Sequence, residues 1–137
     1  MAGNYTLLRK TVTDIITGFE ENGAAQSFSS PSGVAVSESR RLYIADSQNH
    51  RIVILNPDGS FYRYVQDPRS EVLDENYVFT PLKVSVDYAD RVYCVAQNMF
   101  QGIMVFTAEG DFIPRSGISL FTKLRQLTIH LPVRAPP

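Results

Sequence analysis

The residues best suited to chemistry lie in one short stretch, residues 46–51, which reads Asp-Ser-Gln-Asn-His-Arg. This stretch brings a carboxylate, an amide, an imidazole and a guanidinium around a single turn, and such a combination could be mistaken for a catalytic site. The same side chains can also have a purely structural role in the turn. Asp46 can pair with Arg51 or accept hydrogen bonds from turn amides, and Asn49 can adopt the left-handed conformation that few residues accept. We interpret Asp46 as a structural residue of the turn and Asn49, His50 and Arg51 as candidate binding residues on a loop.

The elements that position this turn are predicted to be short β-strands. Runs of β-branched and aromatic residues separated by turn residues are typical of consecutive antiparallel strands. Asp58-Gly59 predicts a tight hairpin turn, since glycine tolerates positive φ. Gly110 predicts a turn of the same kind in the second block. The expected strands of this region are residues 33–36, 41–45, 52–55 and 60–65.

The same order of landmarks occurs twice, about 50 residues apart, and such a period indicates stacked repeat units. The first block runs from Phe28 to Phe61 and the second from Phe79 to Phe112. Four strands per block is the pattern of a propeller blade. The stretch of the second block that corresponds to the reactive-looking turn, residues 96–102, lacks its charged pair. This difference excludes a catalytic role repeated in each block.

Two segments of the first block, Phe28–Val36 and Leu42–Leu55, resemble a nearly complete NHL repeat, a unit of six-bladed β-propellers. The second block is similar but less complete. Residues 17–23 resemble the glycine-bearing connector that precedes such repeats, and residues 11–16 resemble the outer strand of a preceding blade. The resemblance therefore covers about residues 11–113. It implies a propeller fold, and proteins with this repeat are mostly binding platforms.

We predict an all-β fold, a partial β-propeller of about two four-stranded antiparallel blades with an irregular C-terminal tail. Propellers usually need at least four blades, so the missing blades come either from a longer parent chain or from homo-oligomerisation. The expected segments are residues 1–27 (outer strand of a preceding blade and connector), 28–78 (first blade and inter-blade connector), 79–113 (second blade) and 114–137 (a tail whose spacing fits both helix and strand).

Composition narrows the partners and the compartment only in part. The chain has 137 residues, 44% of them hydrophobic, and a formal net charge of −1, which disfavours nucleic acid as a partner. Cys94 is the only cysteine and occupies the position of Ile44, so we expect a buried thiol that packs like a small hydrophobe. The chain shows no apolar run of membrane-spanning length and no signal-peptide pattern, and its localisation stays open.

Loops on one propeller face are the predicted binding surface. Met99 and Phe100 place two large apolar side chains in a loop expected to face solvent, so they either pack against an adjacent blade or bind a partner. The candidate binding residues are Asn49, His50, Arg51, Asn98, Met99, Phe100 and Gln101. The residues assigned to turns and to the structural staple are Asp46, Asp58, Gly59 and Gly110.

The leading functional hypothesis is a non-catalytic interaction scaffold that binds a protein, a peptide or a carbohydrate through these loops. The alternative is a fragment of a lactonase-like or lyase-like propeller enzyme whose metal ligands lie in missing blades. Asp87 and Asp90 lie in a predicted turn, where aspartate usually serves the backbone. The sequence predicts no catalytic residue, no metal ligand and no cofactor in this segment.

Overall fold

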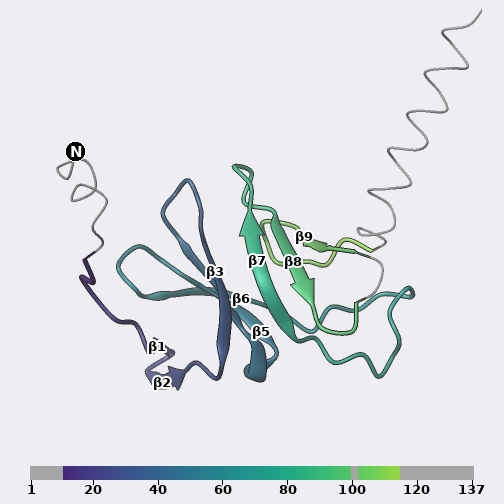
Figure 1. The fold of residues 1–137 in the computed structure, drawn as a ribbon, viewed down its shortest axis with the longest axis horizontal. Helices are drawn as coiled ribbons and strands as arrows, with labels where there is room; N and C mark the ends of the chain where they lie inside the picture. The colour runs from purple at the N-terminus through teal and green to yellow at the C-terminus, as the bar shows by residue number, and fades with distance from the viewer. Residues whose placement is uncertain (1–10, 100–101, 115–137) are drawn as a thin grey trace, which may run out of the picture.

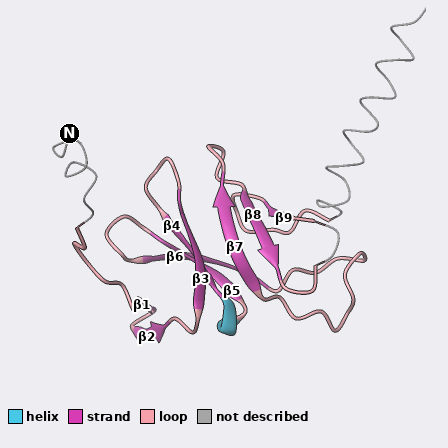
Figure 2. Ribbon diagram, in the orientation of Figure 1, coloured by secondary structure: helices cyan, strands magenta, loops and turns pink. Residues whose placement is uncertain are grey.

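The computed structural model describes residues 11–99 and 102–114, and the regular secondary structure of this part of the chain is almost entirely antiparallel β-strand, joined by turns and loops (Figures 1 and 2). The strands form a two-stranded, a four-stranded and a three-stranded sheet, and within each sheet every strand pairs with its neighbour in the sequence. A 3-10 helix, η1 (Ser47–Asn49), is the one helical element in these residues. The strands are β1 (Gly18–Glu21), β2 (Ala24–Ser27), β3 (Pro31–Val36), β4 (Leu42–Asp46), β5 (Arg51–Leu55), β6 (Phe61–Gln66), β7 (Pro81–Val86), β8 (Val92–Ala96) and β9 (Met104–Phe106).

The first blade is the meander β3-β4-β5-β6. Its strands confirm the four runs expected from the sequence, with ends displaced by one or two residues. The central strands β4 and β5 are buried on both faces, which is why they read as apolar runs rather than as an alternation. Gly59 has φ 89° and its N–H donates to the Asn56 carbonyl at 2.8 Å, so the predicted hairpin turn between β5 and β6 is present.

The second blade, β7-β8-β9, repeats the register of the first. Val34 pairs with Ile44 in the first blade as Val84 pairs with Cys94 in the second, and a bulge follows the proline that opens β3 and β7. Of the expected fourth strand, the described residues show a bridge between Phe106 and Phe112, and residues from 115 onward lie outside the described part of the chain.

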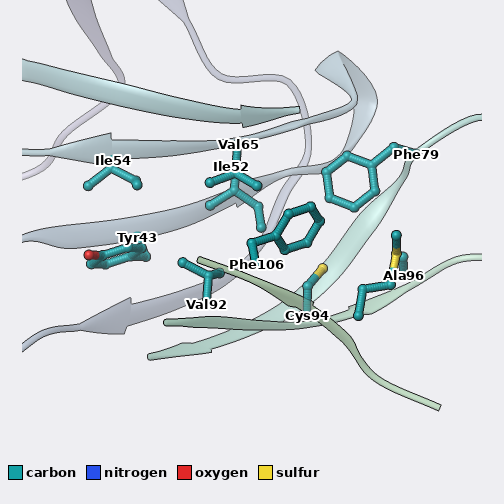
Figure 3. Packing of buried hydrophobic residues seen from close by; sticks show 10 residues of the cluster. Tyr43, Ile52, Ile54, Val65, Phe79, Val92, Cys94, Ala96 and Phe106 are labelled. Carbon is teal, nitrogen blue, oxygen red and sulfur yellow. The ribbon is translucent and has the colours of Figure 1, made fainter. Parts of the chain in front are cut away.

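The main hydrophobic core lies between the two blades (Figure 3). Each blade turns one face to it, and Phe79 closes one end, with its ring 5.7 Å from that of Phe106. Burial of each large apolar side chain contributes about 1.5–3 kcal/mol, so this core joins the blades into one unit. Its buried members are Tyr43, Ile52, Ile54 and Val65 from the first blade, Val92, Cys94, Ala96, Met104 and Phe106 from the second, and Phe79.

A smaller core lies on the opposite face of the first blade, which we call the outer face. There the hairpin β1-β2 packs Phe19 and Phe28 against Phe61 and Tyr64. The glycine-bearing connector expected at residues 17–23 is therefore part of a strand hairpin. Residues 11–17 form no strand, so the outer strand expected at residues 11–16 is wrong; a strand requires a partner ladder, and none of the described residues provides one.

The tail predicted at residues 114–137 lies outside the described residues, apart from residue 114. None of the helical segments in the described part of the chain has the length and apolar character needed to cross a membrane.

Candidate binding site at the blade junction

The turn between β4 and β5 consists of η1 and a left-handed residue, and that residue is His50. Its φ and ψ are 57° and 43°, and its N–H donates to the Ser47 carbonyl at 3.0 Å. The prediction that Asn49 is left-handed is wrong. The Asn49 amide donates to the Asp46 carboxylate at 3.0 Å and to the Ser27 carbonyl at 3.2 Å, which keeps this residue inside η1.

Asp46 is the buried centre of this turn. Its Oδ1 accepts the backbone N–H of Ser29 at 2.7 Å, and its Oδ2 accepts Arg51 Nε at 2.8 Å and the Asn49 amide. The side chain is fully shielded from solvent, so these donors replace the water that an ionised carboxylate requires. The predicted pairing of Asp46 with Arg51 is present, whereas the alternative role, capping the amides of this turn, is not: its side chain makes no capping hydrogen bond to η1, and the backbone N–H that it accepts is that of Ser29.

Arg51 points away from the loop surface and toward the β1-β2 hairpin. Its guanidinium lies 4.8 Å from the centre of the Tyr64 ring and donates to the Tyr64 hydroxyl at 3.1 Å. That hydroxyl in turn donates to Glu21 at 2.8 Å. Burial, helped by the bond to Glu21, raises the pKa of Tyr64 to about 12, so the phenol stays protonated as a donor. Arg51 therefore fastens the hairpin to the first blade.

His50 is exposed and links the turn to the start of the second blade. Its Nδ1 lies 3.0 Å from the Phe79 carbonyl oxygen and 3.2 Å from Thr80 Oγ1. Because a carbonyl oxygen only accepts, the hydrogen bond to Phe79 requires a proton on Nδ1. The imidazole is thus fixed in orientation at the junction of the two blades.

A hollow of about 350 Å³ lies beside His50, and we call it the junction hollow. Three separate segments supply its walls, namely the η1 turn, the end of β6 and the connector that leads to β7. Amide, imidazole and carboxylate groups line it together with apolar side chains, of which Val78 is 58% exposed. The lining residues are Asn49, His50, Gln66, Asp67, Tyr77, Val78 and Phe79.

The connector, residues 67–80, is an ordered rim rather than a free loop. Asp74 accepts backbone N–H groups of Asn76 and Tyr77, which closes a turn. Tyr77 packs against the main core and its hydroxyl donates to the Gln97 carbonyl at 3.1 Å, and burial raises the pKa of this phenol. The wall of the hollow on this side is therefore held by the second blade.

The loop between β8 and β9 is the second-blade counterpart of the η1 turn. Asn98 is left-handed with φ 60°, and Met99 packs against the main core, as one of its two predicted roles required. Phe100 and Gln101 lie outside the described residues. Of the predicted binding residues, the structure places Asn49 and His50 on the junction hollow, while Arg51 and Met99 serve packing and pairing.

The candidate binding residues predicted from the sequence include Asn49 and His50 but none of the other five lining residues, Gln66, Asp67, Tyr77, Val78 and Phe79. The available signal was the length of the connector, because long ordered loops often carry binding sites. The side chains that reach the hollow depend on where that loop folds back, which spacing does not reveal.

The remaining polar clusters serve turns. Burial raises the pKa of Asp87, but hydrogen bonds from Arg91, Tyr93 and Ala89 outweigh it and leave the pKa below its usual value. A hydrogen bond from Ser60 lowers the pKa of Asp58 in the β5-β6 turn. Both carboxylates are therefore engaged in their own hairpins.

The repeated strand register, the order of the strands in each blade and the turn after β4 can be compared with those of known protein families. Residues 28–55 match the family model described as NHL repeat. The chain contains an NHL repeat. The NHL match spans β3, β4, η1 and β5, and NHL repeats form propeller-type domains that are often used for protein interaction. The three sheets are therefore those of a partial propeller. No curated protein matches the chain.

Proposed function

We propose that this chain is a non-catalytic interaction scaffold that binds a protein segment in the junction hollow. The observation that carries the proposal is the convergence of three chain segments on one concave surface beside His50. Concave sites with apolar walls and a few fixed polar groups are the usual form of binding sites.

The chemistry of the hollow suits an extended peptide. The exposed side chain of Val78 offers apolar contact, while the amides of Asn49 and Gln66 can both donate and accept hydrogen bonds. A peptide presents the complementary set, since its backbone carries N–H and C=O groups and its side chains include apolar ones. The fixed His50 ring adds a polar group, Nε2, that needs no reorientation on binding.

The test uses the full chain, fluorescently labelled, on an array of random peptides and on a glycan array. The proposal expects peptide signals that fall at least about tenfold in His50→Gly and in Val78→Asp. Glycine suits position 50 because it accepts the left-handed φ of 57°. Val78 is 58% exposed, so the aspartate variant should leave the fold intact.

Tyr88→Ser is the matched control, because Tyr88 is 85% exposed and lies in the turn between β7 and β8, away from the hollow. It should keep the peptide signals. Signals that persist in both hollow variants would contradict the site, and binding confined to the glycan array would replace the peptide with a carbohydrate. Circular dichroism of each variant separates lost binding from lost structure.

The lack of catalysis is part of the same proposal. Asp46, the most reactive-looking residue of the turn, is fully buried and its oxygens are occupied by Ser29, Asn49 and Arg51. The enzyme alternative places its metal ligands in other blades, so it stays a hypothesis about a longer protein.

A further inference from the structure

The connector between the blades turns its apolar side chains inward and its charged side chains outward. Pro68 and Phe79 are buried. Leu73 and Tyr77 pack against the main core. With four carboxylates against one guanidinium, all of them exposed, the connector has a net charge of −3. The charged residues are Asp67, Arg69, Glu71, Asp74 and Glu75.

Asp67 places one of these carboxylates on the junction hollow. Its backbone is left-handed, with φ 51°, directly after β6. Its Oδ1 lies 2.6 Å from Arg69 Nη2, and the two side chains are 66% and 69% exposed. An ion pair so open to water contributes little to stability, because solvent screens both charges and both side chains lose freedom. The carboxylate on the hollow therefore already holds a guanidinium, and it holds it weakly enough for another to replace it.

The other groups of the hollow suit the rest of an arginine side chain. The exposed Val78 offers an apolar surface on which the methylene stem can pack. The amide oxygens of Asn49 and Gln66 can accept N–H groups of the guanidinium that a single carboxylate leaves unpaired. A planar guanidinium with five donors uses such a set of acceptors better than a lysine ammonium does.

The charge around the hollow favours a cationic ligand over an anionic one. A second hollow of about 370 Å³ on the same connector is lined by the other three carboxylates, those of Glu71, Asp74 and Glu75. Asp74 accepts the N–H of Asn76, whereas Glu71 and Glu75 form no ion pair within the described residues. Carboxylates gathered along one rim raise the local concentration of cations and speed their association.

We infer that the peptide bound in the junction hollow carries an arginine, and that its guanidinium replaces that of Arg69 on Asp67. This inference rests on the proposed function and names the ligand class for the same site. Arg69 then acts as an internal competitor, which occupies the carboxylate while no peptide is bound. The ion pair with Asp67 is thus part of the binding equilibrium as well as a surface contact.

The experiment uses three libraries of short, fluorescently labelled synthetic peptides. Every position except the central one is Ala, Ser, Val or Leu, and the central residue is arginine, citrulline or glutamate. Citrulline has nearly the shape of arginine without its charge. In fluorescence anisotropy titrations with the full chain, the arginine library should bind at least about tenfold more tightly than the citrulline library, and the glutamate library more weakly still. This comparison needs no variant of the protein.

Asp67→Asn tests the carboxylate. Asparagine tolerates the left-handed backbone of this position, and the side chain is exposed, so the variant should keep its fold. The preference for arginine over citrulline should fall below about threefold. Glu20→Gln is the matched control, because it removes the same charge from an exposed position of the β1-β2 hairpin and should leave the preference unchanged.

Arg69→Gln tests the competitor. Removal of its guanidinium should tighten binding of the arginine library by about twofold to threefold and leave binding of the citrulline library unchanged. Arg41→Gln is the matched control, since Arg41 precedes β4 and so lies at the opposite end of that strand from η1. It should leave binding of both libraries unchanged.

Four results would overturn the inference and leave the proposed function standing. They are equal binding of the arginine and citrulline libraries, an arginine preference that persists in Asp67→Asn, an equal loss of that preference in Glu20→Gln, and arginine binding that Arg69→Gln does not tighten. A chain that binds none of the three libraries would remove the proposed function together with this inference.

Discussion

The turn between the second and third strands is held by charge in the first blade and by packing in the second. Asp46 and Arg51 form a buried ion pair in the first, and the equivalent residues of the second are Ala96 and Gly102. There Met99 packs against the main core instead. Strand register is the same in both blades, so backbone pairing and the alternation of side chains set it. The ion pair has a further role, because Arg51 also donates a hydrogen bond to the Tyr64 hydroxyl, which in turn donates to Glu21 of the β1-β2 hairpin. The described part of the second blade has no such attachment.

The largest expected effect is a difference in the alkylation rate of a thiol between the covered face of the second blade and the open face of the first. Val34, on the outer face of the first blade, is 63% exposed. Burial raises the pKa of the Cys94 thiol to about 12 from 9.0, so little thiolate forms at pH 8. We expect iodoacetamide to alkylate Val34→Cys, in a Cys94→Ala background, about a thousandfold faster than native Cys94. Mass spectrometry of timed samples measures both rates, and comparable rates in the folded proteins would show that the two faces do not differ.

The same thiol gives a pH dependence. Because the folded pKa of Cys94 is raised above its unfolded value, its contribution to stability is complete below pH 9 and is lost as pH rises toward about 12. Urea unfolding at a series of pH values checks this, with Cys94→Ala as the control that should lose this part of the alkaline decline.

The next largest effect tests the charge-held turn. Asp46→Ala leaves the Arg51 guanidinium without its buried partner and should lower the free energy of unfolding by about 3–5 kcal/mol. The double variant Asp46→Ala, Arg51→Gly copies the residues of the second blade, and removing both charges should recover part of that loss. Urea unfolding of the two single variants and the double variant measures the coupling, and strictly additive losses would contradict it.

A third prediction tests how closely the blades approach. Gly33→Ala directs a Cβ atom at the backbone of β7, so it should cost about 1–3 kcal/mol in the free energy of unfolding. Lys83→Ala, at the equivalent and exposed position of the second blade, should change stability by no more than about 0.5 kcal/mol. Thermal and urea unfolding compare the two; an equal cost at both positions would contradict the close approach of the blades at Gly33.

The smallest effects concern the hairpin glycines that the blades share. Gly59 and Gly110 have φ values of 89° and 96°, so alanine at either should cost about 1–2 kcal/mol. Gly59 has open space around its Cβ direction, whereas a Cβ atom on Gly110 would lie 3.3 Å from the Tyr64 carbonyl oxygen. Gly110→Ala should therefore be the more destabilising of the two, and the reverse order would show that this contact relaxes freely.

The sequence predicted the features that depend on neighbouring residues. The four strands of the first blade, the Asp58-Gly59 turn and the equivalence of Cys94 with Ile44 follow from local pattern and repeat, and the structure has all three. Features that depend on distant contacts were missed or misplaced. The bond of His50 to Phe79 spans 29 residues, and it is this contact that gives the junction hollow one of its walls.

The left-handed position was misplaced for a related reason. Asparagine tolerates that conformation well, so propensity pointed to Asn49. The buried carboxylate of Asp46 decided otherwise, since it draws the Asn49 amide into η1 and leaves His50 to close the turn. A buried hydrogen bond thus overrides a weak local preference.

Every ladder in the described residues joins strands that are consecutive along the chain. During synthesis the first blade can thus complete its pairing once β6 has left the ribosome, before the second blade has emerged. Until β7 emerges, however, Tyr43, Ile52 and Ile54 face water. This apolar surface of the nascent chain is the kind of surface that chaperones bind.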